Sequence, residues 1–122
     1  MEQWPDRLTN LPTTMVNRTL RSGQSINSDG NVVVLGDVNP GAEVSAVGHI
    51  VVMGALRGVV HAGSTGNENA TITALELVPT QLRIATHITR PPDGSNKDKS
   101  YRPETARIRD DEVIIEEYNP TK

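Results

Sequence analysis

Three histidines, His49, His61 and His87, are the side chains of this 122-residue chain best suited to acid–base or metal chemistry near neutral pH. His49 and His61 are 12 positions apart, and no cluster of carboxylates accompanies them in the sequence. This spacing favours neither a general base within an acid–base constellation nor a two-histidine metal site. We therefore expect corner or surface positions for both, and we predict no bound metal and no cofactor.

Two further segments contain residues that other proteins use for catalysis or phosphate binding. Ser22 lies in Arg21-Ser-Gly-Gln24, which has neither a nucleophile elbow nor an oxyanion loop. The segment Gly63-Ser-Thr-Gly66 lacks the lysine of a phosphate-binding loop, and we expect it to be a corner insertion. The acidic run from Asp110 to Glu112 is typical of a solvated turn. We predict no catalytic residue, and the chain is not expected to be an enzyme.

Composition narrows the possible ligands and the kind of core. The formal charge is −3, and this excess of acidic groups argues against nucleic acid as the main partner. Cysteine is absent, which excludes disulfides and thiolate metal sites. There is no Phe, one Trp and two Tyr, so the core must be built from stacked Val, Ile, Leu and Ala side chains.

An apolar residue recurs every six positions through most of the chain. The structure built by this repeat must position the candidate residues described above. After a four-residue insertion near Ser64 to Asn69 the same step resumes, so that the repeat comprises Ile26, Val32, Val38, Val44, Ile50, Leu56, Ala62, Ile72, Val78 and Ile84. Small residues, mostly glycine, precede many of these positions. This pattern is typical of a β-helix, in which each unit is a short strand followed by a bend. The alternative, a β-sandwich with glycine-rich turns, does not explain a sustained six-residue phase.

Three such units close a coil of about 18 residues. Residues 30–36 match residues 48–54 at that spacing, which indicates that they stack. We expect three inward columns: Val32, Ile50 and Ile72; Val38, Leu56 and Val78; and Ile26, Val44, Ala62 and Ile84.

Strand alternation then places a second set of apolar side chains on the outside of the first face. These outward positions are Val33, Leu35, Val51, Met53 and Leu75, together with Thr73. An apolar patch on a surface usually marks an interface, so we predict that this face is buried in a homodimer. The alternative is that the C-terminal segment folds over it.

The two ends of the chain depart from the repeat. We expect residues 1–17 to be a leader or linker remnant, and residues 18–122 to form the β-helix domain. Residues 90–103 are rich in proline and charge and are expected to be a mobile loop. Residues 106–109 and 112–118 are expected to form a hairpin that turns at Asp110-Asp111 and caps one end of the helix, where strand edges would otherwise be unpaired.

Several segments together resemble the C-terminal domain family of the bacterial septum-site-determining protein MinC. They are Thr19-Leu-Arg-Ser-Gly-Gln24, the segment 32–44, the segment 54–63 and Pro79-Thr-Gln-Leu-Arg-Ile-Ala85, and the resemblance covers about Arg18 to Ile88. It implies an all-β fold, a right-handed three-sided β-helix with a C-terminal hairpin cap, that forms a homodimer. From the resemblance we expect the family's usual N-terminal domain to be absent here.

The resemblance also implies a function and a binding site. It implies a non-enzymatic inhibitor of cell division that is cytoplasmic, is recruited to the inner face of the membrane only through the ATPase MinD, and opposes assembly of FtsZ. The family's MinD-binding motif corresponds here to Arg21, Ser22, Gly23 and Gln24. An extended donor such as Arg21 next to a glycine suits close approach by a partner, although Arg21 could instead only cap the coil end.

One departure from the family and two rival functions remain at this point. Some relatives carry Asp before the glycine of the second repeat, where this chain has Val47, so no partner contact is expected there. A structural β-helix of the bactofilin type would assemble end to end. A β-helical acyltransferase would be a trimer and would bind a thioester.

Overall fold

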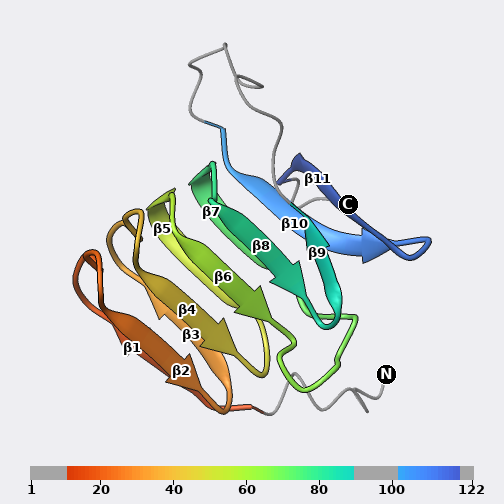
Figure 1. Ribbon diagram of the computed structural model, residues 1–122, viewed down its shortest axis with the longest axis horizontal. Helices are drawn as coiled ribbons and strands as arrows, with labels where there is room; N and C mark the ends of the chain where they lie inside the picture. Colours follow the sequence, from red (N-terminus) through yellow and green to blue (C-terminus); the bar gives the residue numbers. More distant parts are fainter. Residues whose placement is uncertain (1–10, 90–101, 119–122) are drawn as a thin grey trace, which may run out of the picture.

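The computed structural model describes residues 11–89 and 102–118, and this part of the chain contains strands and no helix. The strands wind into a right-handed, three-sided β-helix (Figure 1). The predicted all-β architecture is therefore confirmed. Two sides of the helix are hydrogen-bonded sheets and the third is a narrow ladder.

The first side, sheet A, has the strand order β1-β3-β5-β7-β10-β11. Its first four strands are parallel, and Val32 pairs with Ile50 and Ile50 with Ile72, as the repeat predicted. The strands are β1 (Thr13–Val16), β3 (Asn31–Val34), β5 (Ile50–Leu56), β7 (Ile72–Leu77), β10 (Glu104–Arg109) and β11 (Glu112–Glu117).

The second side, sheet B, has the strand order β2-β4-β6-β8-β9. Its first four strands are parallel, and β9 closes the sheet by pairing antiparallel with β8. The strands are β2 (Ser25–Ser28), β4 (Glu43–Ala46), β6 (Val59–Ala62), β8 (Gln81–Ile84) and β9 (His87–Thr89).

The third side is a ladder of single parallel bridges, from Leu20 to Val38 and from Val38 to Leu56. The Leu20 N–H donates to the Asp37 carbonyl at 2.9 Å, and the Val38 N–H donates to the Ala55 carbonyl at 2.9 Å. These bonds satisfy the backbone where the chain turns between the two sheets.

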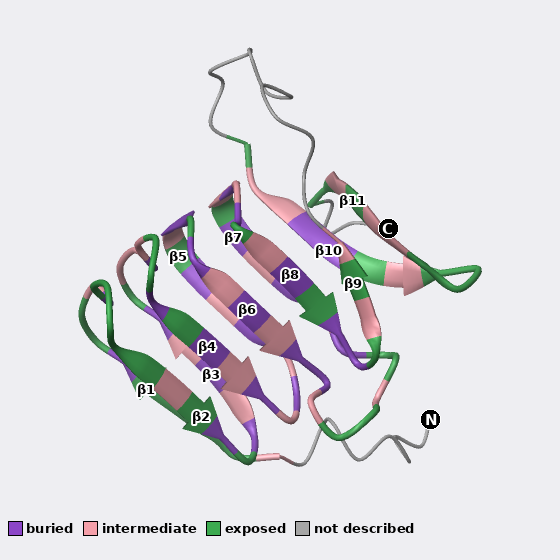
Figure 2. Cartoon of the chain, in the orientation of Figure 1, coloured by how far each residue is buried: buried purple, intermediate pink, exposed green. Residues whose placement is uncertain are grey.

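The core is a narrow column of aliphatic side chains between the three sides. Its fully buried members include Leu20, Ile50, Leu56, Leu82 and Ile84, and none of the described core residues is aromatic. Along β4, β6 and β8 buried positions alternate with more exposed ones (Figure 2). The alternation follows from the period of two in a strand, which sends every second side chain inward.

Two of the three predicted inward columns are wrong in their later coils. Leu56 pairs with Leu77, which is buried, and not with Val78. Val44 pairs with Val60, which pairs with Leu82. Ala62 and Ile84 do pair with each other, but one row away from Val44.

The cause is a corner that loses two residues in the third coil. The inward positions Val38 and Val44 are six residues apart, whereas the equivalent Leu56 and Val60 are four apart. Gly58 allows the shortcut, because a Cβ atom there would lie 2.4 Å from the Ala42 carbonyl oxygen. A prediction that steps by six residues throughout the chain cannot detect this two-residue deletion.

The observed boundaries also differ from the predicted ones at the N-terminal side. Residues 13–16, which we expected in the leader, form β1 and pair with β3. Val16 is buried in the core, and this apolar contact explains why the helix begins before residue 18. Residues 1–10 and 90–101, including most of the predicted loop, lie outside the described residues.

The C-terminal hairpin forms as predicted, with its turn at Asp110-Asp111. Both residues have positive φ, 54° and 67°, as the tight turns of two-residue hairpins require. Strand β10 pairs antiparallel with β7, so the hairpin continues sheet A and covers the edge of the last coil.

The close approach of the Ala42 carbonyl oxygen to Gly58 leads to a prediction about stability. Gly58→Ala should lower the free energy of unfolding by at least ~2 kcal/mol, because the added methyl group overlaps backbone that cannot move freely. Gly66→Ala is the control: Gly66 has φ +109°, but nothing lies within 4 Å of the position that a Cβ atom would take, so only backbone strain is added. Urea unfolding measures both, and a smaller loss for Gly58→Ala than for Gly66→Ala would contradict the explanation.

Candidate partner-binding site

The predicted binding residues form the first corner between the third side and sheet B. Residues Arg21 to Gln24 make a tight turn in which the Gln24 N–H donates to the Arg21 carbonyl at 2.9 Å. Gly23 has φ +89°, the value that a type II turn requires at its third residue and that glycine adopts without strain. The sequence thus folds these four residues into one compact unit.

The Gln24 side chain holds this turn from within. Its Oε1 atom accepts a hydrogen bond from the Arg21 N–H at 2.8 Å and another from the Arg18 guanidinium at 3.3 Å. From the sequence, Arg21 was a possible cap for the end of the coil. In the structure the Gln24 side chain makes the capping hydrogen bonds. The Arg21 side chain makes no hydrogen bond or ion pair with the residues that the structure describes.

The second coil supports the turn from below. Residues 39–42 repeat the same geometry: the Ala42 N–H donates to the Asn39 carbonyl at 2.9 Å, and Gly41 has φ +91°. The Gly23 N–H donates to the Gly41 carbonyl at 3.0 Å. A Cβ atom on Gly41 would lie 2.3 Å from the Ser22 hydroxyl oxygen, so Ser22 packs directly on this glycine.

All four predicted residues are exposed on this rigid base. Gln24 and Gly23 shape the turn and Ser22 packs on the next coil, whereas the Arg21 guanidinium has no hydrogen-bond or ion-pair partner among the described residues. A guanidinium offers five donors in a planar fork, which suits recognition of carboxylates or main-chain carbonyls on a partner. The chemistry that this corner supports is binding.

The outer face of sheet A carries the predicted apolar patch. Leu35, Met53 and Leu75 are 42%, 49% and 39% exposed, and Val33 and Val51 are half-buried beside them. The sequence missed Met15, which pairs with Val33 and is 60% exposed, because residues 13–16 were placed in the leader. We call this set of six residues the apolar face.

The hairpin extends the sheet beside the apolar face and does not fold over it. Thr105 continues the outward row of Thr73, with their hydroxyl oxygens 3.0 Å apart. Beyond it Arg107 and Arg109 both pair with Glu116, at 3.1 and 3.7 Å. Among the described residues, the C-terminal hairpin therefore lies beside the apolar face, and its charged residues flank that face.

One carboxyl group in this hairpin has a shifted pKa. Partial burial, followed by the negative charge of Glu117 on the paired strand, raises the pKa of Glu104 above its usual value. Glu117 itself pairs with Arg102 at 3.1 Å.

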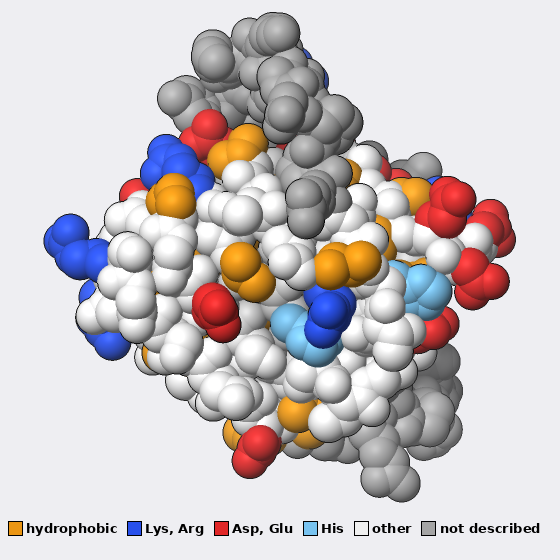
Figure 3. All heavy atoms as spheres, in the orientation of Figure 1, with side chains coloured by type: hydrophobic (Ala, Val, Ile, Leu, Met, Phe, Trp, Pro, Cys, Tyr) orange, Lys and Arg blue, Asp and Glu red, His pale blue; other side chains and the backbone are white. Residues whose placement is uncertain are grey.

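The outer face of sheet B differs from that of sheet A. Figure 3 shows this face, where apolar side chains are scattered among charged and polar ones. A depression of about 310 Å³ is lined by residues that include Glu43, His61 and Arg83. None of the described residues belongs to a helix long and apolar enough to span a bilayer.

His49 and His61 lie at corner and surface positions, as predicted, and each side chain contacts a backbone group. The His49 Nδ1 atom accepts the Thr71 N–H at 3.0 Å, and the His61 Nε2 atom lies 2.9 Å from the Ala85 carbonyl oxygen. His87 differs, because the fold brings it within 4.8 Å of carboxylate atoms of Glu68 and Asp111. Sequence spacing could not reveal this cluster, since its members come from three separate elements.

Comparison with known proteins identifies the family. The family model described as "Septum formation inhibitor MinC, C-terminal domain" matches residues 14–118. The chain belongs to the MinC C-terminal domain family. The match begins at the second residue of β1 and ends just after β11, so it covers all of the β-helix except its first strand residue, together with the hairpin.

Full-length relatives support the same assignment. A probable septum site-determining protein MinC from Heliobacterium modesticaldum is 59% identical over 107 residues, which are 88% of this chain and 37% of that protein. The equivalent protein from Symbiobacterium thermophilum is 62% identical over 104 residues, 85% of this chain and 45% of that protein. The chain thus spans less than half the length of these MinC relatives.

A solved structure matches as well. A chain of the MinC:MinD cell division protein complex from Aquifex aeolicus superposes with a TM-score of 0.83 at 39% identity. The match covers 88% of this chain and 87% of that chain.

The claim that Gln24, and not Arg21, stabilises the turn can be tested without a binding partner. Gln24→Ala should lower the free energy of unfolding by about 0.5–1 kcal/mol and speed hydrogen exchange at the Arg21 amide, because its acceptor is lost. Arg21→Ala is the control, since it keeps the main-chain N–H that Gln24 accepts. Equal exchange rates in the two variants, measured by NMR, would show that Gln24 does not hold the turn.

Proposed function

We propose that this chain is a non-enzymatic division-inhibitor domain that dimerises through the apolar face and binds MinD through the Arg21–Gln24 corner. The observation that carries the proposal is the match to a solved MinC:MinD complex at 39% identity and a TM-score of 0.83. The family description as a septum formation inhibitor supports the same role.

The geometry supports MinD binding at the corner by two features. The turn is already hydrogen-bonded within the chain, because Gln24 closes it and the second coil supports it, so we expect little conformational entropy to be lost on binding. Arg21 is exposed, and its charge is not matched by an acid among the described residues. A desolvated arginine is a frequent source of binding energy at interfaces.

The apolar face supports a separate dimer contact. Its exposed Met and Leu side chains lie in adjoining rows on neighbouring parallel strands, an arrangement that suits a two-fold contact between two copies of the sheet. The MinD corner lies on another side of the β-helix, between the third side and sheet B. One dimer would therefore present two MinD sites at once.

Two sites on one dimer give the proposed mechanism. Bivalent attachment to membrane-bound MinD raises the effective concentration of the second contact, and it places the dimer near FtsZ polymers at the membrane. The chain itself would be cytoplasmic and would reach the inner face of the membrane only through MinD. Its part in inhibition is then to help target the inhibition of FtsZ assembly, which prevents misplaced septa. The comparisons favour neither a bactofilin-type filament nor an acyltransferase.

Arg21→Ala should weaken binding to MinD by at least about 30-fold, the factor that corresponds to the loss of ~2 kcal/mol from a central interface arginine. The melting temperature should not change, because the turn is held by Gln24. Co-sedimentation with MinD, ATP and lipid vesicles measures the binding.

Arg83→Ala is the matched control for that experiment. Arg83 is an exposed arginine on β8, on the outer face of sheet B. The Arg83→Ala variant should therefore bind MinD as well as the unmodified chain does. Undiminished sedimentation of Arg21→Ala, or equal losses in both variants, would contradict the site.

Met53→Asp should convert the dimer to a monomer, because an unpaired carboxylate buried in an interface costs ~3 kcal/mol or more. Ile88→Asp is the control: Ile88 is 50% exposed but lies on β9, in sheet B. Analytical ultracentrifugation measures both. A dimer that persists in Met53→Asp would rule out the apolar face as the interface.

A further inference from the structure

The three residues Glu68, His87 and Asp111 come together at the last coil of the β-helix, although they are far apart in the sequence. Glu68 lies in the insertion after β6, His87 is the first residue of β9, and Asp111 is in the hairpin turn between β10 and β11. One potential ligand atom from each lies within 4.8 Å of the other two. We propose that these three side chains form a binding site for a divalent transition-metal ion such as Zn²⁺.

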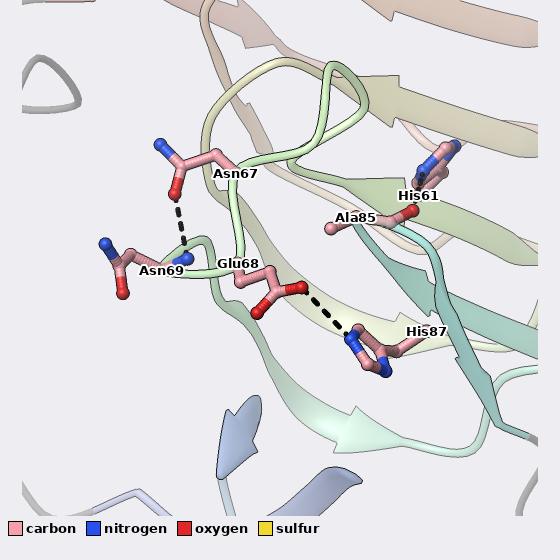
Figure 4. Close-up of polar contacts among 6 residues, drawn as sticks. All are labelled: His61, Asn67, Glu68, Asn69, Ala85 and His87. Carbon is pink, nitrogen blue, oxygen red and sulfur yellow. Dashed lines mark hydrogen bonds and ion pairs between the residues drawn. The ribbon is translucent and has the colours of Figure 1, made fainter. Parts of the chain in front are cut away.

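The pair formed by His87 and Glu68 already has the separation that a shared metal ion requires. The His87 Nε2 atom lies 3.2 Å from the Glu68 Oε2 atom (Figure 4). Zinc binds imidazole nitrogen and carboxylate oxygen at about 2.0–2.1 Å, so two ligands of a tetrahedral ion are about 3.3 Å apart. The pair can therefore bind one ion with little movement of either side chain.

The ligand types select the class of metal. One imidazole nitrogen with two carboxylate oxygens suits zinc and similar first-row ions, whereas calcium and magnesium prefer oxygen ligands alone. The third ligand, Asp111, is exposed, and so is Glu68, which leaves room for water at the remaining coordination position. His87 is more buried, with 25% of its side chain exposed, and it anchors the site to β9.

Charge also favours a cation here. Two carboxylates within 4.8 Å of each other repel. A divalent ion removes this repulsion. It would also tie the hairpin turn to the insertion loop and to β9, two elements that the contact between Glu68 and His87 already links. The site would then act as a structural clamp that closes the hairpin-capped end of the β-helix.

Zinc binding to the chelator-treated chain tests the site by isothermal titration calorimetry at neutral pH. The expected result is one Zn²⁺ per chain, with affinity at least about tenfold lower in His87→Ala and in Asp111→Asn. Binding should also weaken as the pH falls, because protonated imidazole cannot bind metal. Circular dichroism confirms that each variant is folded before titration.

Asp110→Asn is the matched control, because it changes the neighbouring carboxylate of the same turn. Asparagine tolerates positive φ at both positions, so the two Asp→Asn variants differ only in whether a ligand is removed. Zinc should also raise the melting temperature of the unmodified chain and of Asp110→Asn, but not of His87→Ala. Absence of one-to-one binding, or equal affinity in His87→Ala and the unmodified chain, would overturn the proposal.

Discussion

The parallel hydrogen-bonded register between successive coils is the constraint on which the rest of this structure depends. Each coil contributes only a few Val, Ile, Leu or Ala side chains to the core, too few to bury an apolar surface alone. Stacking turns them into continuous columns, such as Val32, Ile50 and Ile72. The backbone groups of one coil are satisfied by the next, and the hairpin covers the last strand edge of sheet A.

The same register determines where the chain can meet partners. A strand that points every second side chain inward must point the others outward, so the columns that fill the core generate the apolar face on sheet A. Corner stacking likewise builds the Arg21–Gln24 turn, because its support is the equivalent turn at residues 39–42. The two proposed surfaces are thus consequences of one repeat, and they lie on different sides of the helix, which keeps dimerisation and MinD binding compatible.

Much of this could be predicted from the sequence, and the failures have physical causes. The six-residue period predicted the β-helix, the column through Ile50 and the exposed Met53, because stacking and alternation are local rules. It could not predict the shortcut at Gly58, which moves Val60 opposite Val44, because a deletion at a corner leaves no apolar signal. Met15 was missed because one short edge strand shows too little periodicity to be separated from a leader. The Glu68–His87–Asp111 cluster depends on tertiary contacts that spacing does not encode.

The central claim is that MinD binds the Arg21–Gln24 corner while the apolar face holds the dimer. Hydrogen–deuterium exchange of the dimer, with and without MinD and ATP on lipid vesicles, tests it most directly. The account predicts that MinD slows exchange in residues 18–24 and in the supporting turn at 39–42, and leaves the outer strands of sheet A unchanged. Protection confined to sheet A or to the face of sheet B, with the corner unaffected, would contradict it.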